Sequence, residues 1–499
     1  MARYTIDEVK IEGAYPVEEI LELAMDCGVN AHGTLTYGGL VDESAAMQYV
    51  EQRADGQTVK VFLRGELEFC GCPQKVAVDC QDDHCYLRVT LVTSSQLMDI
   101  EPHDRFFQDT SRSFADILTA SYDDSGIGTL LAIRGTDQIE KPILQYRDTD
   151  WEFTLRMASR LGTVVIPDVT AQAPYVALGV PNRPVLSETG AVAYSISRDA
   201  AKFRSAHAAN IGISYSNFLC RKLDSDNHYK LGDSVNISGE TFVVVGKNFL
   251  YENGEVLEHY VFGHEQEFAV PFYKNKRIAG LELEGRVLER SGQDIRVLLD
   301  IDAARENDGK FWFGYAPCTN NGMYSMPLEN EKVMLQWQSA ADEDVLIVRL
   351  NRQNGFAMPR PCERHFLTED DAHLQMIPDK MEYTNPAGNL TLLAANGFNI
   401  STGGKFSIFA QKDINIKAQG QVRVYSPERI SACKTGVESS IDLISNELHV
   451  KAPIRVKSTS KANKYKGTTL PKRAPKTEIS AKTASKLAAA VPQITNVGK

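Results

Sequence analysis

The sequence lacks the features that mark several common classes of protein. Its 499 residues contain no run of about eighteen apolar residues, so no segment is expected to span a membrane as a helix. Residues 1–8 have neither an apolar core nor a cleavage pattern, so we expect no secretory signal there. The net charge of −11 argues against an overall basic footprint for nucleic acid.

Cysteine frameworks and catalytic signatures are also missing. Nine cysteines, an odd number, fit a reducing compartment better than a disulfide framework. No Gly-x-Ser-x-Gly motif and no paired catalytic carboxylates stand out. We therefore expect a protein that is not an enzyme, with no catalytic residue, no cofactor and no bound metal.

One cysteine cluster invites a zinc interpretation: Cys70, Cys72, Cys80 and Cys85, with His84 beside them. Standard zinc modules place two to four residues within each ligand pair, and this spacing differs. A purely structural role is favoured, while a non-standard metal site or a reversible disulfide are the alternatives.

Two other clusters of polar residues are also expected to be structural. His259 and His264, followed by Glu265 and Glu267, are interpreted as a polar loop between domains rather than as metal ligands. Asp148 and Asp150 precede Trp151, and Asp150 is predicted to be the N-cap of a helix.

The chain is long enough for two to four domains, and strand signals dominate it. Residues 60–69 and 85–92 alternate as half-buried strands do. Helices are predicted over 16–26, 113–121 and 150–161, where apolar residues recur at helical spacing. Between residues 279 and 350, five short strands predict a small barrel of the OB type, at 285–288, 295–299, 311–315, 332–337 and 345–348.

The most informative pattern is an eight-residue repeat that begins near Leu390 and ends near Val424. Each repeat holds an apolar-x-apolar triplet, and Gly, Asn or Lys-Asp turn formers separate the triplets. The apolar positions are Leu390, Leu392, Phe398, Ile400, Phe406, Ile408, Ile414, Ile416, Val422 and Val424.

Both apolar residues of a triplet lie on the same face of a strand. One narrow strand per layer cannot enclose a core, so this face needs partners. Three intertwined copies would close an apolar core, whereas coils of a single-chain β-helix need roughly twenty residues. We therefore predict a trimeric β-helix or β-prism, with an ordinary β-meander as the alternative.

Three further segments resemble the hub-spike proteins of contractile injection systems, such as the valine-glycine repeat protein G (VgrG) of type VI secretion and phage hub-spike equivalents. Residues 143–153, ILQYRDTDWEF, are similar to a "QYRESDWDF" segment of that family. Residues 105–109, RFFQD, resemble its "R-x-F-Q-N" segment, and 324–333 resemble the strand that ends its OB domain. Glu329-Asn330-Glu331 departs from the family's Gly-Asp-Glu, which implies a divergent branch, and the tail after Val456 has no counterpart.

The resemblance implies a mainly β protein with several barrel-like parts. The expected domains are a hub of two barrel-like subdomains over 1–275, the OB-fold over 279–350, an irregular neck over 351–384, the spike over 385–457 and a flexible basic tail over 458–499. It implies a homotrimer that contacts tail tube and baseplate proteins and carries a PAAR-like tip protein or an effector. Such a protein would be made in the cytoplasm, built into an injection apparatus and delivered outward.

Two functions of other classes stay open at this point. The OB domain could bind carbohydrate or single-stranded nucleic acid, although it lacks a dense basic face with aromatic residues. An envelope hydrolase is a further alternative, but only about thirty residues separate the predicted barrel from the repeat. The tail has nine Lys or Arg and one acid between Thr459 and Lys499. It could bind a cap protein or cargo, contact an anionic membrane or nucleic acid, or be a solvated linker.

Overall fold

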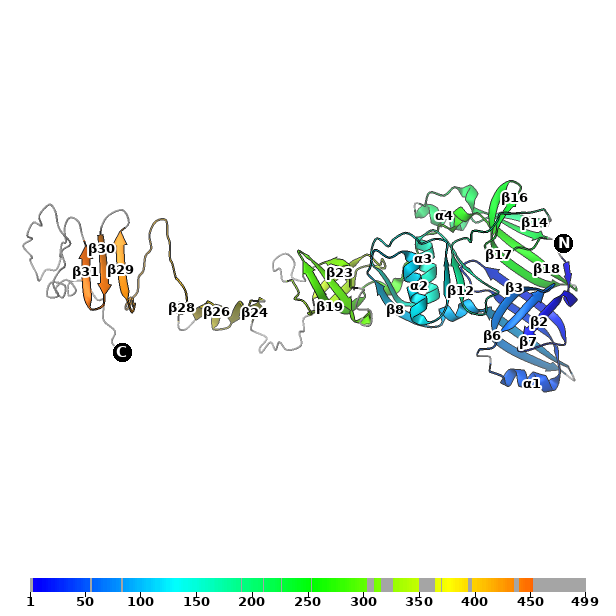
Figure 1. Cartoon of the computed structure of the whole chain (residues 1–499), viewed down its shortest axis with the longest axis horizontal. Coiled ribbons are helices and arrows are strands. Elements are labelled where there is room, and N and C mark those ends of the chain that lie inside the picture. The colour runs from blue at the N-terminus through cyan, green and yellow to red at the C-terminus, as the bar shows by residue number, and fades with distance from the viewer. Residues whose placement is uncertain are drawn as a thin grey trace, which may run out of the picture. The chain divides into compact units, whose positions relative to one another are not determined.

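The computed structural model describes residues 3–451, except 54–55, 82–83, 190, 210, 226, 253, 303–308, 316–325, 350–363, 369, 394–396 and 435–438. The chain divides into two compact units, residues 1–361 and 362–499. The predicted mainly β class is confirmed (Figure 1). No helix among the described residues is long and apolar enough to cross a membrane.

A 13-stranded sheet forms most of the hub. Its main path runs β14-β15-β18-β17-β3-β4-β7-β6-β5-β2, and β17 joins β3 in register from Gly246–Gly28 to Leu250–Ala24. The strands are β1 (Arg3–Thr5), β2 (Val9–Gly13), β3 (Glu19–Gly28), β4 (Thr34–Val41), β5 (Val59–Leu63), β6 (Glu66–Gln81), β7 (His84–Thr93), β13 (Leu186–Ser187), β14 (Ala191–Arg198), β15 (Leu219–Ser225), β16 (Ser234–Ile237), β17 (Glu240–Glu252) and β18 (Glu255–Gly263).

The sheet encloses two separate apolar cores. One lies among β2–β7 and includes Leu35, Tyr37 and Val61, whereas the other lies among β15–β18 and includes Phe242 and Tyr260. Helix α1 (Glu43–Glu51) contacts β6 and β7, and helix α4 (Ala200–Ala208) contacts the segment at Tyr215–Phe218.

A mixed layer lies next in the chain. Helix α2 (Phe114–Ser125) and helix α3 (Asp150–Arg160) share an apolar core with strands β9 (Thr129–Ala132), β11 (Val165–Pro167) and β12 (Tyr175–Leu178). Strands β8 (Pro102–Phe107) and β10 (Ile143–Thr149) form an antiparallel pair beside them.

Both helices begin at capping boxes. Ser113 caps α2 with Asp116, and Thr149 caps α3 with Glu152, so the first backbone N–H groups are satisfied. The prediction that Asp150 is the N-cap is therefore wrong by one residue.

The helix predicted over residues 16–26 is also wrong, because these residues lie largely in strand β3. Leu23, Met25 and Cys27 are buried at every second position, which is a strand period. The apolar residues fit both periods in the sequence, and pairing with β4 and β17 selects the strand.

The last part of the first unit is a five-stranded antiparallel sheet in the order β21-β20-β19-β22-β23. An isolated parallel bridge between Tyr315 and Ile347 joins its two ends into a barrel. Its strands are β19 (Glu282–Ser291), β20 (Asp294–Leu299), β21 (Trp312–Gly314), β22 (Lys332–Trp337) and β23 (Val345–Arg349).

The second unit contains two smaller sheets. A meander of five antiparallel strands comprises β24 (Arg364–Leu367), β25 (His373–Ile377), β26 (Lys380–Asn385), β27 (Gly388–Leu393) and β28 (Gly397–Thr402). A three-stranded sheet comprises β29 (Arg429–Lys434), β30 (Ser439–Ile444) and β31 (Glu447–Lys451). Strands β24–β26 replace the part of the expected irregular neck that lies within residues 364–384. The first part of the neck, 351–363, and the tail over 458–499 lie outside the described residues.

Candidate functional site

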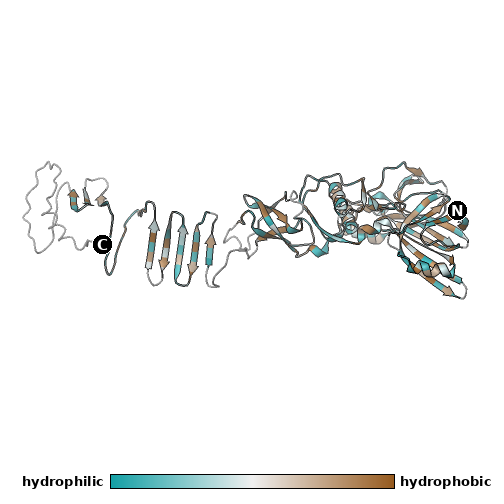
Figure 2. Cartoon of the chain, turned by 60° about the horizontal axis from the view of Figure 1, so that its bottom comes forward, coloured by the Kyte–Doolittle hydropathy of each residue, from teal (hydrophilic) through white to brown (hydrophobic). Residues whose placement is uncertain are grey.

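The meander β24–β28 has one apolar face and one polar face. Figure 2 shows brown and teal residues alternating along its strands. The register places the apolar residues directly opposite one another: Phe366 with Leu374, Met376 with Met381, Leu374 with Tyr383, Tyr383 with Leu390, Met381 with Leu392, Leu390 with Ile400 and Leu392 with Phe398. This set is named the apolar sheet face.

Much of the apolar sheet face is accessible to solvent in the single chain. The exposed fraction is 58% for Phe398 and 41% for both Ile400 and Met381. Contiguous exposed apolar surface of this kind is typical of an interaction site in a soluble protein. The face is therefore the strongest candidate for a functional surface.

The opposite face carries a network of hydrogen bonds. Glu382 accepts hydrogen bonds from Lys380 on its own strand and from Thr391 on β27, at 3.1 Å for the latter. Lys380, the larger cause, and Thr391 hold the pKa of Glu382 below its usual value. His365 and His373 stack beside them with ring nitrogens 2.9 Å apart. The polar face can remain in contact with water. The apolar face is therefore the one expected to bind a partner.

The ten residues predicted to form a trimer core fall into two groups. Leu390 and Leu392 lie on β27, and Phe398 and Ile400 lie on β28, in the register that the repeat implies. Gly397, the first residue of β28, has φ at 87°, a conformation that favours glycine.

The other six core candidates lie in segments that form no strand in the single chain. They are Phe406, Ile408, Ile414, Ile416, Val422 and Val424, and each is exposed. Ile416 is 73% exposed, whereas Leu392, which has a paired strand on each side, is 40% exposed. The role of all ten as a trimer core stays a prediction.

The three-stranded sheet β29–β31 is two-faced in the same way. Ile441 pairs with Ala432 on one side and with Val450 on the other, which gives one apolar row. On the opposite face Asp442 accepts hydrogen bonds from Ser431, Arg429 and Ser440, which lower its pKa to about 2. The strand pattern therefore continues beyond the region where the eight-residue spacing breaks.

Sequence reasoning missed strands β24–β26, although a signal was present. Leu374 and Met376, then Met381 and Tyr383, are apolar-x-apolar triplets like those of the repeat. Their starting points precede Leu390 by sixteen and nine residues, so the spacing deviates by one residue from a strict period of eight. The apolar residues still lie on one face of the sheet, because turns of different length connect strands that pair in the same register.

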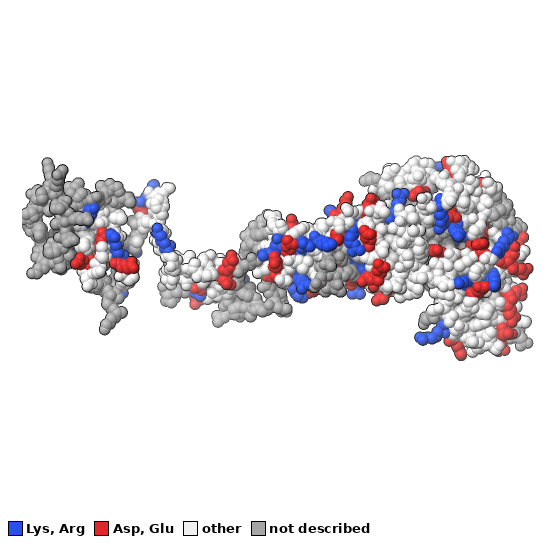
Figure 3. Space-filling model, viewed as in Figure 1, with Lys and Arg blue, Asp and Glu red and all other residues white. Residues whose placement is uncertain are grey.

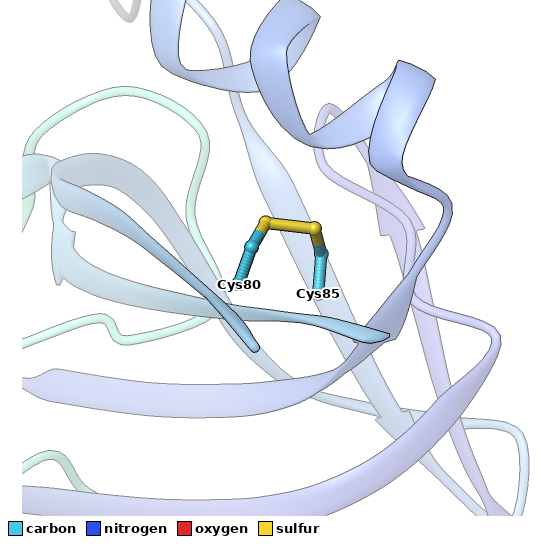
Figure 4. Close-up of a disulfide and its surroundings, with 2 residues drawn as sticks. All are labelled: Cys80 and Cys85. Carbon is cyan, nitrogen blue, oxygen red and sulfur yellow. A yellow bond between two sulfur atoms is a disulfide. The ribbon is translucent and has the colours of Figure 1, made fainter. Parts of the chain in front are cut away.

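The structure separates the residues of the candidate cysteine cluster. Cys80 and Cys85 form a disulfide across the β6–β7 hairpin, with 4.1 Å between their Cα atoms (Figure 4). Cys70 and Cys72 are free thiols elsewhere on β6, and burial raises the pKa of each. The structure therefore places Cys80 and Cys85 in a disulfide rather than in a metal site, and the reversibility of this bond stays a prediction.

The predicted polar loop at His259 is a strand instead. His259 lies on β18 and pairs with Asp224 on β15, and His264 packs its ring 4.3 Å from that of Phe242. Glu265 is exposed and pairs with Arg134 at 3.1 Å. Glu267 is buried in the short 3₁₀ segment Glu265–Phe268, where a Cβ atom added at Gly263 would lie 1.9 Å from its Oε1.

Burial raises the pKa of Glu267 to about 7, from 4.5. The folded chain then holds this proton more tightly than the unfolded chain, so the contribution to stability is complete below pH 4.5 and is lost as pH rises to about 7. We expect Glu267→Gln to remove a pH-dependent change on the order of 2 kcal/mol in the free energy of unfolding of the hub. Urea titrations between pH 5 and pH 8 measure it.

The matched control is Glu265→Gln, two residues away on the surface. It should keep the pH dependence of the native chain. An equal slope in the Glu267→Gln variant would contradict the assignment.

Asp148 and Asp150 belong to a buried ionic network. Arg105 donates to Asp150 at 2.6 Å and to Gln145 at 2.8 Å. Arg156 bridges two carboxylates, since it lies 2.9 Å from Asp148 and 2.8 Å from Asp342.

This network joins the α2–α3 layer to the five-stranded barrel. Asp342 belongs to the barrel, and the core of the barrel also includes Phe106 and Leu144 from strands β8 and β10. Phe106 stacks on Phe313 at 6.0 Å and meets Trp337 edge-on at 5.5 Å. The segments 105–109 and 143–153 therefore form the joint between hub and barrel.

No protein-family model matches the sequence, and no curated protein does either. Solved structures do match. One chain of the Francisella PdpA–VgrG complex in its half-lidded form aligns with a TM-score of 0.51 at 8% identity, over 79% of this chain and 88% of that one. The lidless PdpA–VgrG complex aligns with a TM-score of 0.50 at 8% identity, over 79% and 98%.

The Escherichia coli c3393 protein is described as a component of the type VI secretion system that is structurally similar to the T4 bacteriophage tail proteins gp27 and gp5. It aligns with a TM-score of 0.49 at 12% identity, over 68% of this chain and 99% of that one. At these identities the likeness to the PdpA–VgrG chains concerns the fold alone.

Proposed function

We propose that the chain is the hub and spike of a contractile injection apparatus. The observation that carries this proposal is the apolar sheet face of β24–β28, on a chain whose fold matches a chain of the PdpA–VgrG complex over 79% of its length. The role is mechanical: the second unit punctures a target envelope and the hub holds it in the apparatus.

Three copies of the chain associate through their apolar sheet faces. A face of this kind, with the exposed residues Met381, Leu392, Phe398 and Ile400, is covered when three copies pack around an axis. Covering these residues also lets the segments at 406–408, 414–416 and 422–424 pair with neighbouring copies, which would form a β-prism without open edges. Such a closed shaft unfolds slowly, which suits a needle under force.

The barrel of β19–β23 is of the OB type. Its strand order, in which the first strand pairs with the second and the fourth and the third meets the fifth in parallel, supports this assignment. In Figure 3, basic and acidic side chains mix over the visible face of this barrel. Single-stranded nucleic acid favours a continuous basic groove, so we propose that the barrel serves as a collar rather than as a binding module.

The partners are tail tube and baseplate proteins at the hub, and a tip protein or effector at the C-terminal end. The matching solved complex pairs VgrG with PdpA, which supports a protein partner for this chain as well. The chain is made in the cytoplasm and leaves the cell within the apparatus.

The mass of the purified protein in solution tests the proposal. Light scattering coupled to size exclusion at micromolar concentration should give about three times the chain mass of 55.3 kDa. Adding the protein to a peptidoglycan suspension should leave the turbidity of the suspension unchanged. A monomer, or loss of turbidity, would refute the trimeric structural role.

A further inference from the structure

Four polar side chains converge where β6, β17 and β18 meet in the hub. They are Glu68 on β6, Lys247 on β17, Glu258 on β18 and His228 in the turn before β16. Glu68 and Glu258 are almost fully buried, with exposed fractions of 4% and 2%, whereas the side chain of His228 is 37% exposed. Among the described residues, Glu68, His228 and Glu258 form the one group of three potential ligands with ligand atoms within 4.8 Å of one another.

In each of the two carboxylates, one oxygen accepts hydrogen bonds from residues other than the three potential ligands. Oε2 of Glu258 accepts hydrogen bonds from Tyr4 at 3.3 Å and Tyr260 at 3.0 Å. Oε2 of Glu68 accepts a hydrogen bond from Lys247 at 2.7 Å. The remaining oxygens face His228, and Oε1 of Glu258 is buried without a hydrogen bond.

Both ring nitrogens of His228 face carboxylate oxygens. Nε2 lies 3.0 Å from Oε1 of Glu68, and Nδ1 lies 3.5 Å from Oε1 of Glu258. An imidazole nitrogen binds a metal ion through its lone pair. Nδ1 and Oε1 of Glu258 face each other closely enough for one ion to lie between them.

We propose that Glu68, His228 and Glu258 form a binding site for a divalent transition metal, with Zn²⁺ as the ion that fits best. Zinc takes imidazole nitrogen and carboxylate oxygen at about 2.0–2.2 Å, and tetrahedral geometry then separates the ligand atoms by roughly 3.3 Å. The 3.5 Å between Nδ1 and Oε1 of Glu258 is close to that separation. The exposed side of His228 gives the ion access and leaves a position for water.

The outer contacts resemble those of structural metal sites. Hydrogen bonds from Tyr4 and Tyr260 orient the carboxylate of Glu258, as partners around metal ligands usually do. The two carboxylates balance a divalent charge. The ammonium of Lys247 lies 2.7 Å from Oε2 of Glu68 and 3.8 Å from Oε1 of Glu258, so it adds a positive charge beside the ion. The bound ion fastens β6, from the first barrel-like part, to β17, β18 and the turn at His228.

The competing occupant is a proton on His228. An imidazolium could donate to both carboxylates, and the group would then be an ion-paired clasp with Lys247. The two occupants respond differently to the loss of Lys247. Without its ammonium, a metal site becomes more negative and binds Zn²⁺ more tightly, whereas a clasp simply weakens.

Calorimetric titration of the tag-free, EDTA-treated full-length protein with ZnCl₂ tests the site. We expect one tight ion per chain, and a tetrahedral absorption band when Co²⁺ replaces Zn²⁺. His228→Ala and Glu258→Gln should each weaken Zn²⁺ binding at least about tenfold, in line with the loss of a ligand or its support. Tyr4→Phe should weaken it less.

The matched control is His259→Ala, since the side chain of His259 is also 37% exposed and pairs with one carboxylate, Asp224. It should bind Zn²⁺ as the native protein does. Lys247→Met should bind Zn²⁺ more tightly, with a larger rise in melting temperature on addition of the ion. The proposal is overturned if the native protein binds no Zn²⁺ at 100-fold excess, or if His228→Ala binds as tightly as His259→Ala. A Lys247→Met variant with a lowered melting temperature that Zn²⁺ does not raise would instead indicate that a proton on His228 occupies the site.

Discussion

Replacing Ile400 with aspartate is expected to convert the proposed trimer into monomers. Ile400 lies on the apolar sheet face, opposite Leu390 on the neighbouring strand. In a trimer built on this face, three carboxylates would enter an apolar core without partners, at a cost of several kcal/mol each. Light scattering should then report a mass near 55.3 kDa. Ile408→Asp and Ile416→Asp should act in the same way.

The control for this variant is its neighbour on the strand. Asn399→Asp adds the same charge on the polar face, beside Thr391, and should leave the trimer intact. The hub should melt at the same temperature in both variants, because residues 362–499 form a separate compact unit. Trimers that persist in Ile400→Asp would show that the copies associate through another surface.

Removing the carboxylate of Asp342 should give the largest loss of stability in the first unit. Asp342 is fully buried and accepts two hydrogen bonds from Arg156, which is itself only 4% exposed. In Asp342→Ala the guanidinium of Arg156 loses a buried partner, and breaking such a pair costs about 3–5 kcal/mol. Chemical denaturation monitored by tryptophan fluorescence measures this loss, since Trp337 donates a hydrogen bond to the Asp342 carbonyl.

The next residue supplies the control. Glu343 pairs with Arg160 at 3.2 Å, but its side chain is 40% exposed, and an exposed pair is worth about 0–1 kcal/mol. Glu343→Ala should therefore change the stability little. The double variant Arg156→Met/Asp342→Leu should recover part of the loss, because it removes both charges of this pair but also takes Arg156 away from Asp148. Equal losses in Asp342→Ala and Glu343→Ala would contradict the importance of the buried pair.

Local chemistry explains which parts of the fold could be predicted from the sequence. Helices α2 and α3 each begin at a capping pair, Ser113 with Asp116 and Thr149 with Glu152. Such a pair before an apolar run marks a helix start in the sequence itself. The strands of the barrel were also predictable, since their apolar residues alternate over short runs between turns. The first strands of the repeat, β27 and β28, follow from the same rule.

The remaining elements depend on contacts between distant residues. Residues 16–26 became strand β3 because β4 and β17 lie on either side of it, and β17 is more than two hundred residues away. Helix α1 buries only Ala46, so its apolar signal is weak. The Cys80–Cys85 pair required the β6–β7 register to be known.

The candidate sites divide in the same way. The apolar sheet face is local in sequence, so its residues were largely predictable. The group formed by Glu68, His228 and Glu258 was not, because its members come from three separate parts of the chain. No spacing rule connects residues that only the sheet brings together.

The alternation of the β24–β28 meander constrains how the length of this segment can change by insertion or deletion. Loss of one strand with its turn leaves every later side chain on its face, because the turns absorb the difference between spacings of seven, eight and nine residues along this sheet. It also reverses the direction in which the chain leaves the sheet, since neighbouring strands are antiparallel. Gain or loss of sixteen residues keeps both face and direction, whereas an odd change within a strand exchanges the two faces from that point onward. Viable length variants of this segment are therefore expected to differ by whole hairpins.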